Sequence, residues 1–312
     1  MWITLALPAE RVAAQGLPAY MPINPMTAGR SGVYFQPYVD PRPGGVRLAI
    51  NLDYASAIEY NIPAPEPSWL LDAELMRLSL TATRDLGPEA FMLAEANLNG
   101  AYNGFLDGFL QWYHNLFGFR MPERDARPKN TFGYQLALPG VRFDGRRSDL
   151  FLGDLRLGYG RRWTPELQSV LVVTLPTATG PDGYGRGTPS VSALNTVRTE
   201  LGSRLIVEMG FGLGYTPTHG PISPYQRTVF ASASSGARFR FWGRQALFAN
   251  FIYHTPYYHD TQLPALDRKE LTLDFGWLLA RTGGGDWRIG LTEDLQPSGP
   301  AVDLIFRFGA RF

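Results

Sequence analysis

Residues 205–215 read Leu-Ile-Val-Glu-Met-Gly-Phe-Gly-Leu-Gly-Tyr, and this stretch decides the fold. Every second residue from Leu205 to Tyr215 is apolar, whereas the positions between them hold Ile206, Glu208 and three glycines. Because side chains alternate between the two faces of a β-strand, one face of this segment is continuously apolar and the other is mostly small or charged. The stretch therefore predicts a β-strand with two chemically different faces.

The same alternation recurs along the chain, at residues 46–54, 151–159, 271–279 and 302–312. Several of these runs are longer than the roughly 5–6 residues that are usual in water-soluble sheets. Their length matches the roughly 9–11 residues that a tilted strand needs to cross a membrane. Aromatic residues end many of the runs, as in the interfacial girdles of membrane barrels: Tyr54, Tyr159, Tyr215, Phe241, Trp242, Tyr253 and Trp287.

The connections between the runs alternate between short and long. Short ones lie near 84–89, 161–165, 202–204, 242–245 and 281–285, and long ones near 56–69, 101–149, 176–190, 216–227, 255–268 and 295–300. Bacterial membrane barrels have short periplasmic turns and longer external loops. The pattern predicts an all-β fold, a transmembrane antiparallel up-and-down β-barrel of about twelve strands over residues 46–312.

Two further segments are strand-like. We place residues 131–143 in a hairpin within the long external loop 101–149, and residues 31–39 before the barrel. If both crossed the membrane, the barrel would have about fourteen strands, which is the alternative count.

The C-terminal run is the most specific signal for the outer membrane. Residues 302–312 alternate between apolar and polar positions, and the last residue is Phe312. A terminal aromatic on such a strand is typical of proteins that the barrel-assembly machinery inserts. We therefore expect Phe312 to act as an assembly signal, with outer-membrane lipid and lipopolysaccharide as the surroundings.

The composition excludes several classes of protein. The 312 residues include 29 basic and 28 acidic side chains, for a net charge of +1, and no Cys. The balanced charge argues against a nucleic-acid partner, and the lack of Cys excludes disulfides and thiolate metal sites. No run reaches about 18 consecutive apolar residues, so no transmembrane helix is predicted.

The N-terminus is interpreted in two parts. Residues 1–14 contain a short apolar run followed by small residues, which we interpret as a signal peptide shortened by a misplaced start codon. A disordered leader is the alternative. Residues 15–45 are interpreted as a periplasmic lead-in to the barrel.

Three motifs resemble those of known outer-membrane proteins. Residues 104–109 (Gly-Phe-Leu-Asp-Gly-Phe) and 112–118 (Trp-Tyr-His-Asn-Leu-Phe-Gly) resemble the signature of a family catalogued as a domain of unknown function, DUF3187. Residues 175–180 (Leu-Pro-Thr-Ala-Thr-Gly) are similar to the Leu-Pro-Thr-Gly strand exit of transport-like barrels, with two residues between Pro176 and Thr179. The resemblance spans most of the chain from about residue 20. It implies a barrel in a Gram-negative outer membrane and no particular activity.

A single helix is predicted, over residues 105–118, in the long external loop. Its apolar residues recur at helical spacing, and Asp107 and His114 share the opposite face. These two are candidate catalytic residues, an acid/base pair. Seven residues of helix span about 10.5 Å, too far for a direct bond between them. An amphipathic helix at the membrane interface or in the barrel mouth is the alternative.

Other chemistry is weakly indicated. The serines of 231–236 have no neighbouring His, and His254 and His259 with Asp260 are too sparse to predict a metal site. No cofactor or metal is expected.

The strand phase assigns a set of charged side chains to the barrel interior. These candidate pore-lining residues are Arg47, Asp53, Arg77, Glu95, Asp154, Arg156, Glu208, Arg238, Arg240, Asp274, Arg288 and Arg307. They could line a narrow, charge-selective water channel, or they could fill the lumen with ion pairs.

The sequence thus predicts a porin-like channel or small-molecule transport pore for an unknown solute. One alternative is an enzyme that modifies lipid or lipopolysaccharide, and another is a closed structural barrel whose loops bind a partner.

Overall fold

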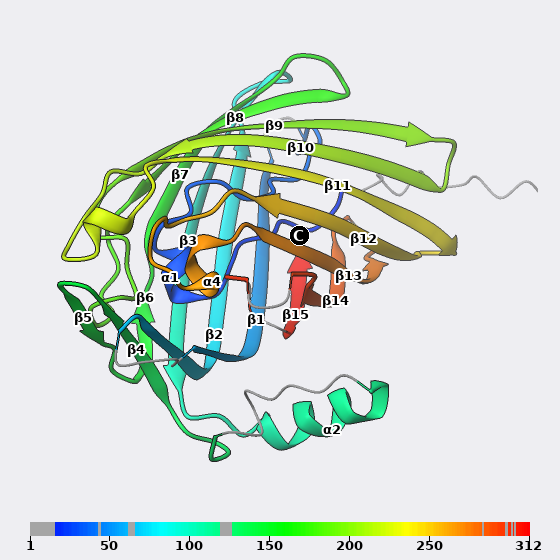
Figure 1. The fold of residues 1–312 in the computed structure, drawn as a ribbon. Helices are drawn as coiled ribbons and strands as arrows, with labels where there is room; N and C mark the ends of the chain where they lie inside the picture. The colour runs from blue at the N-terminus through cyan, green and yellow to red at the C-terminus, as the bar shows by residue number, and fades with distance from the viewer. Residues whose placement is uncertain are drawn as a thin grey trace, which may run out of the picture.

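Fifteen strands form one antiparallel sheet in the computed structural model, which describes residues 16–42, 45–61, 66–118, 127–282, 284–296, 299–300, 302 and 304–312. Most strands pair with the next strand in the sequence (Figure 1). The strands are β1 (Val46–Asn61), β2 (Ser68–Asp85), β3 (Ala90–Tyr102), β4 (Gly133–Leu138), β5 (Val141–Asp144), β6 (Ser148–Leu152), β7 (Leu155–Arg162), β8 (Leu167–Leu175), β9 (Ser190–Leu201), β10 (Leu205–Tyr215), β11 (Val229–Trp242), β12 (Gln245–His254), β13 (Glu270–Ala280), β14 (Asp286–Asp294) and β15 (Leu304–Arg311).

The sheet closes into a barrel because β1 pairs with β15, with Tyr54 opposite Phe306 at this seam. Strands β6 and β7 both pair with β3, so they form one wall strand that is interrupted at residues 153–154. Within the described part of the chain, the β4–β5 hairpin pairs only with the first residues of β2. The described residues therefore form a closed barrel of twelve strands, which confirms the predicted count and the predicted hairpin.

The exposure of the deciding stretch identifies the orientation of the wall. On β10, the apolar Met209, Phe211 and Leu213 are each about half exposed, at 52%, 51% and 49%, whereas Glu208 is completely buried. The apolar face therefore points outward and the polar face points into the barrel. This is the reverse of a water-soluble sheet and matches the membrane-barrel pattern.

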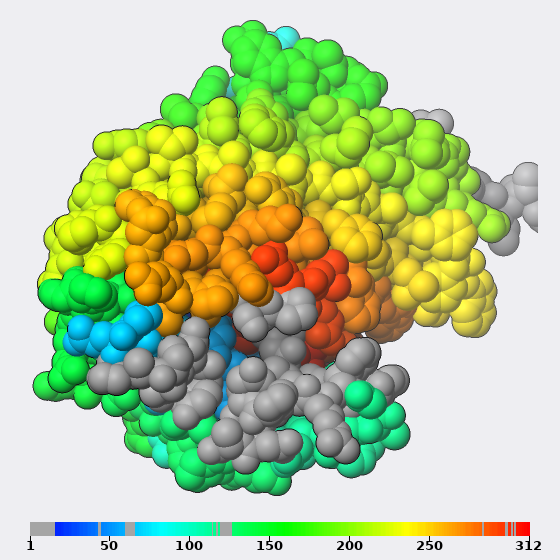
Figure 2. All heavy atoms as spheres, viewed as in Figure 1, coloured from blue at the N-terminus to red at the C-terminus, as the bar shows by residue number. Residues whose placement is uncertain are grey.

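The connections divide between the two ends of the barrel as predicted. Five tight turns, which join β2–β3, β7–β8, β9–β10, β11–β12 and β13–β14, lie at one end, which we call the short-turn end. The start of β1 and the end of β15 lie at the same end. The longer connections lie at the other end, the long-loop end, where the β12–β13 connection (orange) covers part of the face in view (Figure 2).

Among the described residues, four short helical segments accompany the strands: α1 (Pro25–Ala28), α2 (Asp107–Phe117), η1 (Ser223–Tyr225) and α4 (Pro264–Asp267). The predicted helix at 105–118 corresponds to α2. In Figure 1, α1 lies within the ring of strands and α2 lies outside it. Across the residues that the structure describes, no helix has both the length and the apolar character needed to span a membrane.

Candidate functional site

The lumen of the barrel is occupied by residues 16–42, which we call the plug. At the short-turn end, the carbonyl of Gly16 accepts a hydrogen bond from Arg311 at 2.9 Å. At the long-loop end, the Asn24 side chain donates to Glu59 at 2.7 Å. The chain then returns to the short-turn end, where the amide of Arg42 donates to the carboxylate of Asp85, the last residue of β2. The plug is thus U-shaped, with α1 at its apex.

This location differs from the lead-in outside the barrel that the sequence suggested for residues 15–45. The physical reason is burial: Leu17, Tyr20 and Phe35 of the plug form an apolar cluster with Phe248, Leu278 and neighbouring residues of the wall. The amide of Tyr20 also donates to the carbonyl of Phe35 at 3.2 Å, which joins the two legs of the plug. The strand-like residues 31–39 belong to the second leg and do not join the sheet.

Glycines of the wall make room for the plug. On β10, Gly210, Gly212 and Gly214 face the lumen, and a Cβ atom at Gly212 would lie 2.2 Å from Cγ1 of Val33. A Cβ at Gly210 would lie 3.1 Å from the ring of Phe35. The glycines of β10 therefore allow the backbone of the wall and the side chains of the plug to approach each other closely.

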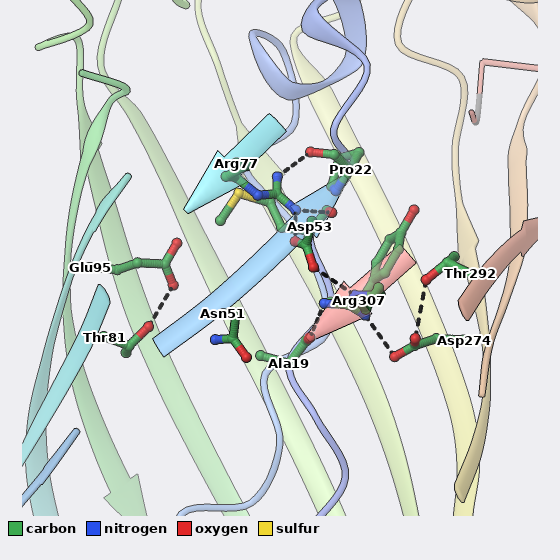
Figure 3. Close-up of polar contacts among 12 residues, drawn as sticks. Ala19, Pro22, Asn51, Asp53, Arg77, Thr81, Glu95, Asp274, Thr292 and Arg307 are labelled. Carbon is green, nitrogen blue, oxygen red and sulfur yellow. Dashed lines mark hydrogen bonds and ion pairs between the residues drawn. The ribbon is translucent and has the colours of Figure 1, made fainter. Parts of the chain in front are cut away.

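Arginines of the wall bind the backbone carbonyls of the plug. Arg77 donates to the carbonyls of Met21 at 2.7 Å and Pro22 at 2.5 Å, and Arg307 donates to Ala19 at 2.8 Å (Figure 3). The plug has little regular secondary structure, so its buried carbonyls need partners from elsewhere. A guanidinium suits this role because it carries five donors and no acceptor.

The same arginines form a central ion-pair network (Figure 3). Asp53 accepts from Arg77 at 2.7 Å and from Arg307 at 3.0 Å, while Arg307 also donates to Asp274 at 2.7 Å. Arg288 lies 3.9 Å from Asp53. Three arginines therefore share two carboxylates, all buried.

A second network lies at the short-turn end of the lumen. Asp85 accepts from Arg47 at 2.5 Å and from Arg162 at 2.7 Å. Arg198 donates to Asp40 of the plug at 2.6 Å. Asp85 is therefore shared by two arginines, whereas Arg198 also pairs with Glu200 at 2.7 Å.

A third cluster holds the apex of the plug at the long-loop end. Arg30 donates to the carbonyls of Thr216 at 3.0 Å and Arg227 at 2.6 Å, and Arg186 pairs with Asp154 at 3.1 Å. Burial lowers the pKa of the Arg30 guanidinium to about 10, so it stays protonated at neutral pH. Burial likewise lowers the pKa of Arg186, and the nearby Asp154 opposes that shift.

Three cavities follow the plug along the lumen. The upper cavity, of about 520 Å³, lies at the long-loop end and is lined by Arg30 and Arg186. The middle cavity, of about 70 Å³, shares Arg186 with the upper one and is also lined by Arg156. The lower cavity, of about 400 Å³, lies at the short-turn end and is lined by Glu95 and Arg288. An ion pair of 3.1 Å between Arg156 and Glu95 separates the middle cavity from the lower one.

The structure places the predicted pore-lining residues on the lumen side of the wall. Glu208 accepts from the amide of Tyr38 at 3.3 Å, and Arg240, near a short turn, donates to the carbonyl of Ser203 at 2.6 Å. Arg238, two residues before Arg240 on β11, is buried. The strand phase therefore identified the inward-facing side chains. Whether they line an open path stays a prediction.

Helix α2 lies against the outer wall, over the β1–β15 seam. The rings of Phe105 and Tyr54 are 6.0 Å apart, and those of Phe109 and Phe306 are 6.1 Å apart. Trp112 is 58% exposed. The helix therefore packs on the outside of the barrel and does not enter its mouth.

The candidate acid/base residues fall on this helix. The carboxylate of Asp107 accepts from Ser56 at 3.2 Å and from the amide of Asn130 at 2.6 Å, contacts that fix the helix and the loop after it. The side chain of His114 lies outside the described part of the structure. Within that described part, no cluster of His, Asp and Glu groups could hold a metal ion.

The predicted assembly signal, Phe312, packs at the end of β15. Its amide donates to the carbonyl of Leu48 at 2.8 Å, its ring lies 6.3 Å from that of Trp287, and Arg281 lies 4.2 Å over it. Phe312 is thus anchored to β1 and to β14, the two strands that neighbour β15.

The comparisons with known proteins support this fold. The model of a family described as "Protein of unknown function (DUF3187)" matches residues 42–177, in agreement with the predicted resemblance but over a narrower stretch. A search of curated proteins finds no significant match.

Among solved structures, the chain is similar to the COG4313 outer membrane channel from Pseudomonas putida F1, with a TM-score of 0.54 and 15% identity, over 88% of this chain and 100% of that one. It also resembles the NanC porin, with a TM-score of 0.47 and 6% identity over 86% and 99% of the two chains. The Pseudomonas putida toluene transporter TodX matches with a TM-score of 0.40 and 10% identity over 86% and 89%. At such identities, the first of these likenesses supports the barrel fold alone.

Proposed function

We propose that this chain is an outer-membrane channel for small solutes and that its plug is the gate. In this proposal the short-turn end faces the periplasm and the long-loop end faces outward, as in bacterial barrels generally. The outward apolar face of the wall supports the membrane location. The observation that carries the channel function is the series of three cavities beside the plug, which extends from one end of the lumen to the other.

The contacts of the plug suit a segment that leaves and returns. Many of them are hydrogen bonds from wall arginines to backbone carbonyls, such as those of Arg77 and Arg307. Water can replace such bonds, and each contributes only about 0.5–1.5 kcal/mol net, or somewhat more when the donor is charged. The carboxylates Asp53 and Asp274 lie on the wall and not on the plug, so these arginines keep their ion pairs after the plug leaves.

A disulfide between plug and wall tests the gate. A Cβ atom at Gly32 would lie 3.6 Å from Cβ of Ser190, within the range of about 3.5–4.5 Å found in disulfides. The chain has no Cys of its own, so the variant Gly32→Cys/Ser190→Cys would form a single defined bond. We expect conductance steps in a planar bilayer under reducing conditions and silence after oxidation. The two single-Cys variants under the same oxidation are the controls.

The outcomes separate the remaining hypotheses. Steps in both redox states would overturn the plug as the gate. Silence in both states, from a barrel that is verified as folded, would favour the closed structural barrel, which the occupied lumen also fits. The described contacts of Asp107 organise α2, so we advance no enzymatic role.

A further inference from the structure

The lower cavity has the size and lining of a ligand site. Its volume of about 400 Å³ lies between the plug and the inner faces of β1, β2, β3, β13, β14 and β15. Pro18, Ala19 and Leu278 give it apolar walls, and Arg47 and Arg288 bring charge. Small-molecule sites are typically of about 300–1,000 Å³, mostly apolar, with a few placed polar groups.

Arg288 is a buried cation without a carboxylate of its own. Its Nη2 donates to Asn51 at 3.0 Å, and its nearest carboxylate, Asp53, lies 3.9 Å away. That carboxylate already accepts shorter hydrogen bonds from Arg77 and Arg307. Within the described residues, Nε of Arg288 has no hydrogen-bond partner. Burying a charged guanidinium costs free energy unless an anion and hydrogen-bond acceptors compensate for the lost water. Because Arg288 is only partly compensated in this way, its site favours an anionic ligand.

Arg47 also lines the cavity. It shares Asp85 with Arg162, and its own Nε is also unpartnered among the described residues.

The acidic residues that line the cavity are each paired with an arginine, and the three pairs are Glu95 with Arg156, Asp286 with Arg311 and Asp40 with Arg198. The charge that remains for a ligand in this cavity is therefore positive.

We propose that the lower cavity binds a small organic monocarboxylate, with its carboxylate at Arg288 and its apolar body against Pro18, Ala19 and Leu278. A carboxylate accepts charge-assisted hydrogen bonds from a guanidinium, which a neutral analogue of the same shape cannot do. As a substrate class for transport, this inference rests on the proposed channel function. As a binding site, it can be tested without transport.

The test is calorimetric titration of the full chain in detergent with benzoate, and with benzyl alcohol as its neutral analogue. We expect saturable binding of benzoate and none of benzyl alcohol. Arg288→Gln should weaken benzoate binding at least about tenfold, which corresponds to about 1.4 kcal/mol. Arg161→Gln is the matched control, because Arg161 is an exposed arginine near a short turn that does not line the cavity.

A second variant keeps the test decisive if Arg288→Gln does not fold. Ala49 faces the cavity from β1, so Ala49→Leu would fill it without changing any charge, and benzoate binding should be lost. The site is overturned if benzoate does not bind, if Arg288→Gln binds as the unmodified chain does, or if benzyl alcohol binds equally well. Binding by a barrel that stays silent in the bilayer would support the site and overturn the channel.

Discussion

Val33 of the plug lies directly over Gly212 of β10, so that any Cβ atom at position 212 would stand 2.2 Å from Cγ1 of Val33. The two residues are far apart in the sequence, and one belongs to the wall while the other belongs to the segment inside it. The absence of a side chain at Gly212 therefore leaves room for Val33 of the plug, and also for Ser232 and Leu194 of the wall, whose atoms would lie 2.8 Å and 2.9 Å from that Cβ.

Gly212→Ala should displace the plug while the barrel stays closed on itself. Overpacking costs about 1–3 kcal/mol, and each 1.4 kcal/mol shifts the docked–undocked equilibrium about tenfold. The measurement is the fraction of time that single channels are open. The double variant Gly212→Ala/Val33→Ala should shift the channel back towards its closed state, because it removes the nearest of the contacts at Gly212. A Gly212→Ala channel as closed as the unmodified one would contradict this account.

Glu95 and Arg156 should behave as a coupled pair. Removing one partner leaves a buried charge unpaired, at a cost of about 3–5 kcal/mol, whereas removing both avoids that cost. We expect Glu95→Ala and Arg156→Ala each to lower the urea midpoint of unfolding more than the double variant does. Destabilisations that simply add in the double variant would show that the pair is not coupled.

The sequence predicted the wall well and the plug poorly. Strand phase identified Asp53, Arg77 and Arg307 as inward-facing, because alternation is a local property that the chain carries residue by residue. The plug has no such period, and its partners are backbone carbonyls, which every residue has. A signal was nevertheless present: Tyr20, Val33 and Phe35 are more apolar than a solvated lead-in requires.

The position of α2 was also beyond sequence reasoning. Its amphipathic pattern predicted a helix, but its docking depends on Glu74, which faces outward from β2. The carboxylate of Glu74 accepts from the amides of Phe105 and Leu106, each at 2.5 Å. From the sequence alone, nothing indicates that an outward-facing carboxylate on β2 would bind the backbone of a distant loop.

Glu74→Gln should loosen α2 without affecting the barrel. Loss of a charged acceptor for two helix-entry amides costs about 1–2 kcal/mol locally. Limited proteolysis should therefore cut the region of residues 103–130 faster, while conductance and the unfolding midpoint stay unchanged. Glu166→Gln, at a short turn, is the control. Unchanged proteolysis would mean that Glu74 does not hold the helix.

Phe312→Ala should reduce the yield of folded barrel in cells more than it reduces refolding from urea into detergent. If Phe312 is the assembly signal that we propose, the first process also depends on its recognition, whereas the second depends only on contacts such as that with Trp287. The heat-modifiable fraction on a gel reports both. Equal losses in the two processes would show that Phe312 contributes only packing contacts and is not an assembly signal.

The U-shaped path of the plug has a mechanical consequence. Because Gly16 and Arg42 both lie at the short-turn end, neither leg has to be threaded through the barrel for the plug to enter or leave. A pulling force on the N-terminal side of Gly16 would peel out the first leg, then α1, then the second leg, while every strand of the wall keeps its neighbours. In a force–extension trace, extraction of about 27 residues, at roughly 3.3–3.6 Å each, would precede any rupture of the barrel as a separate, reversible event.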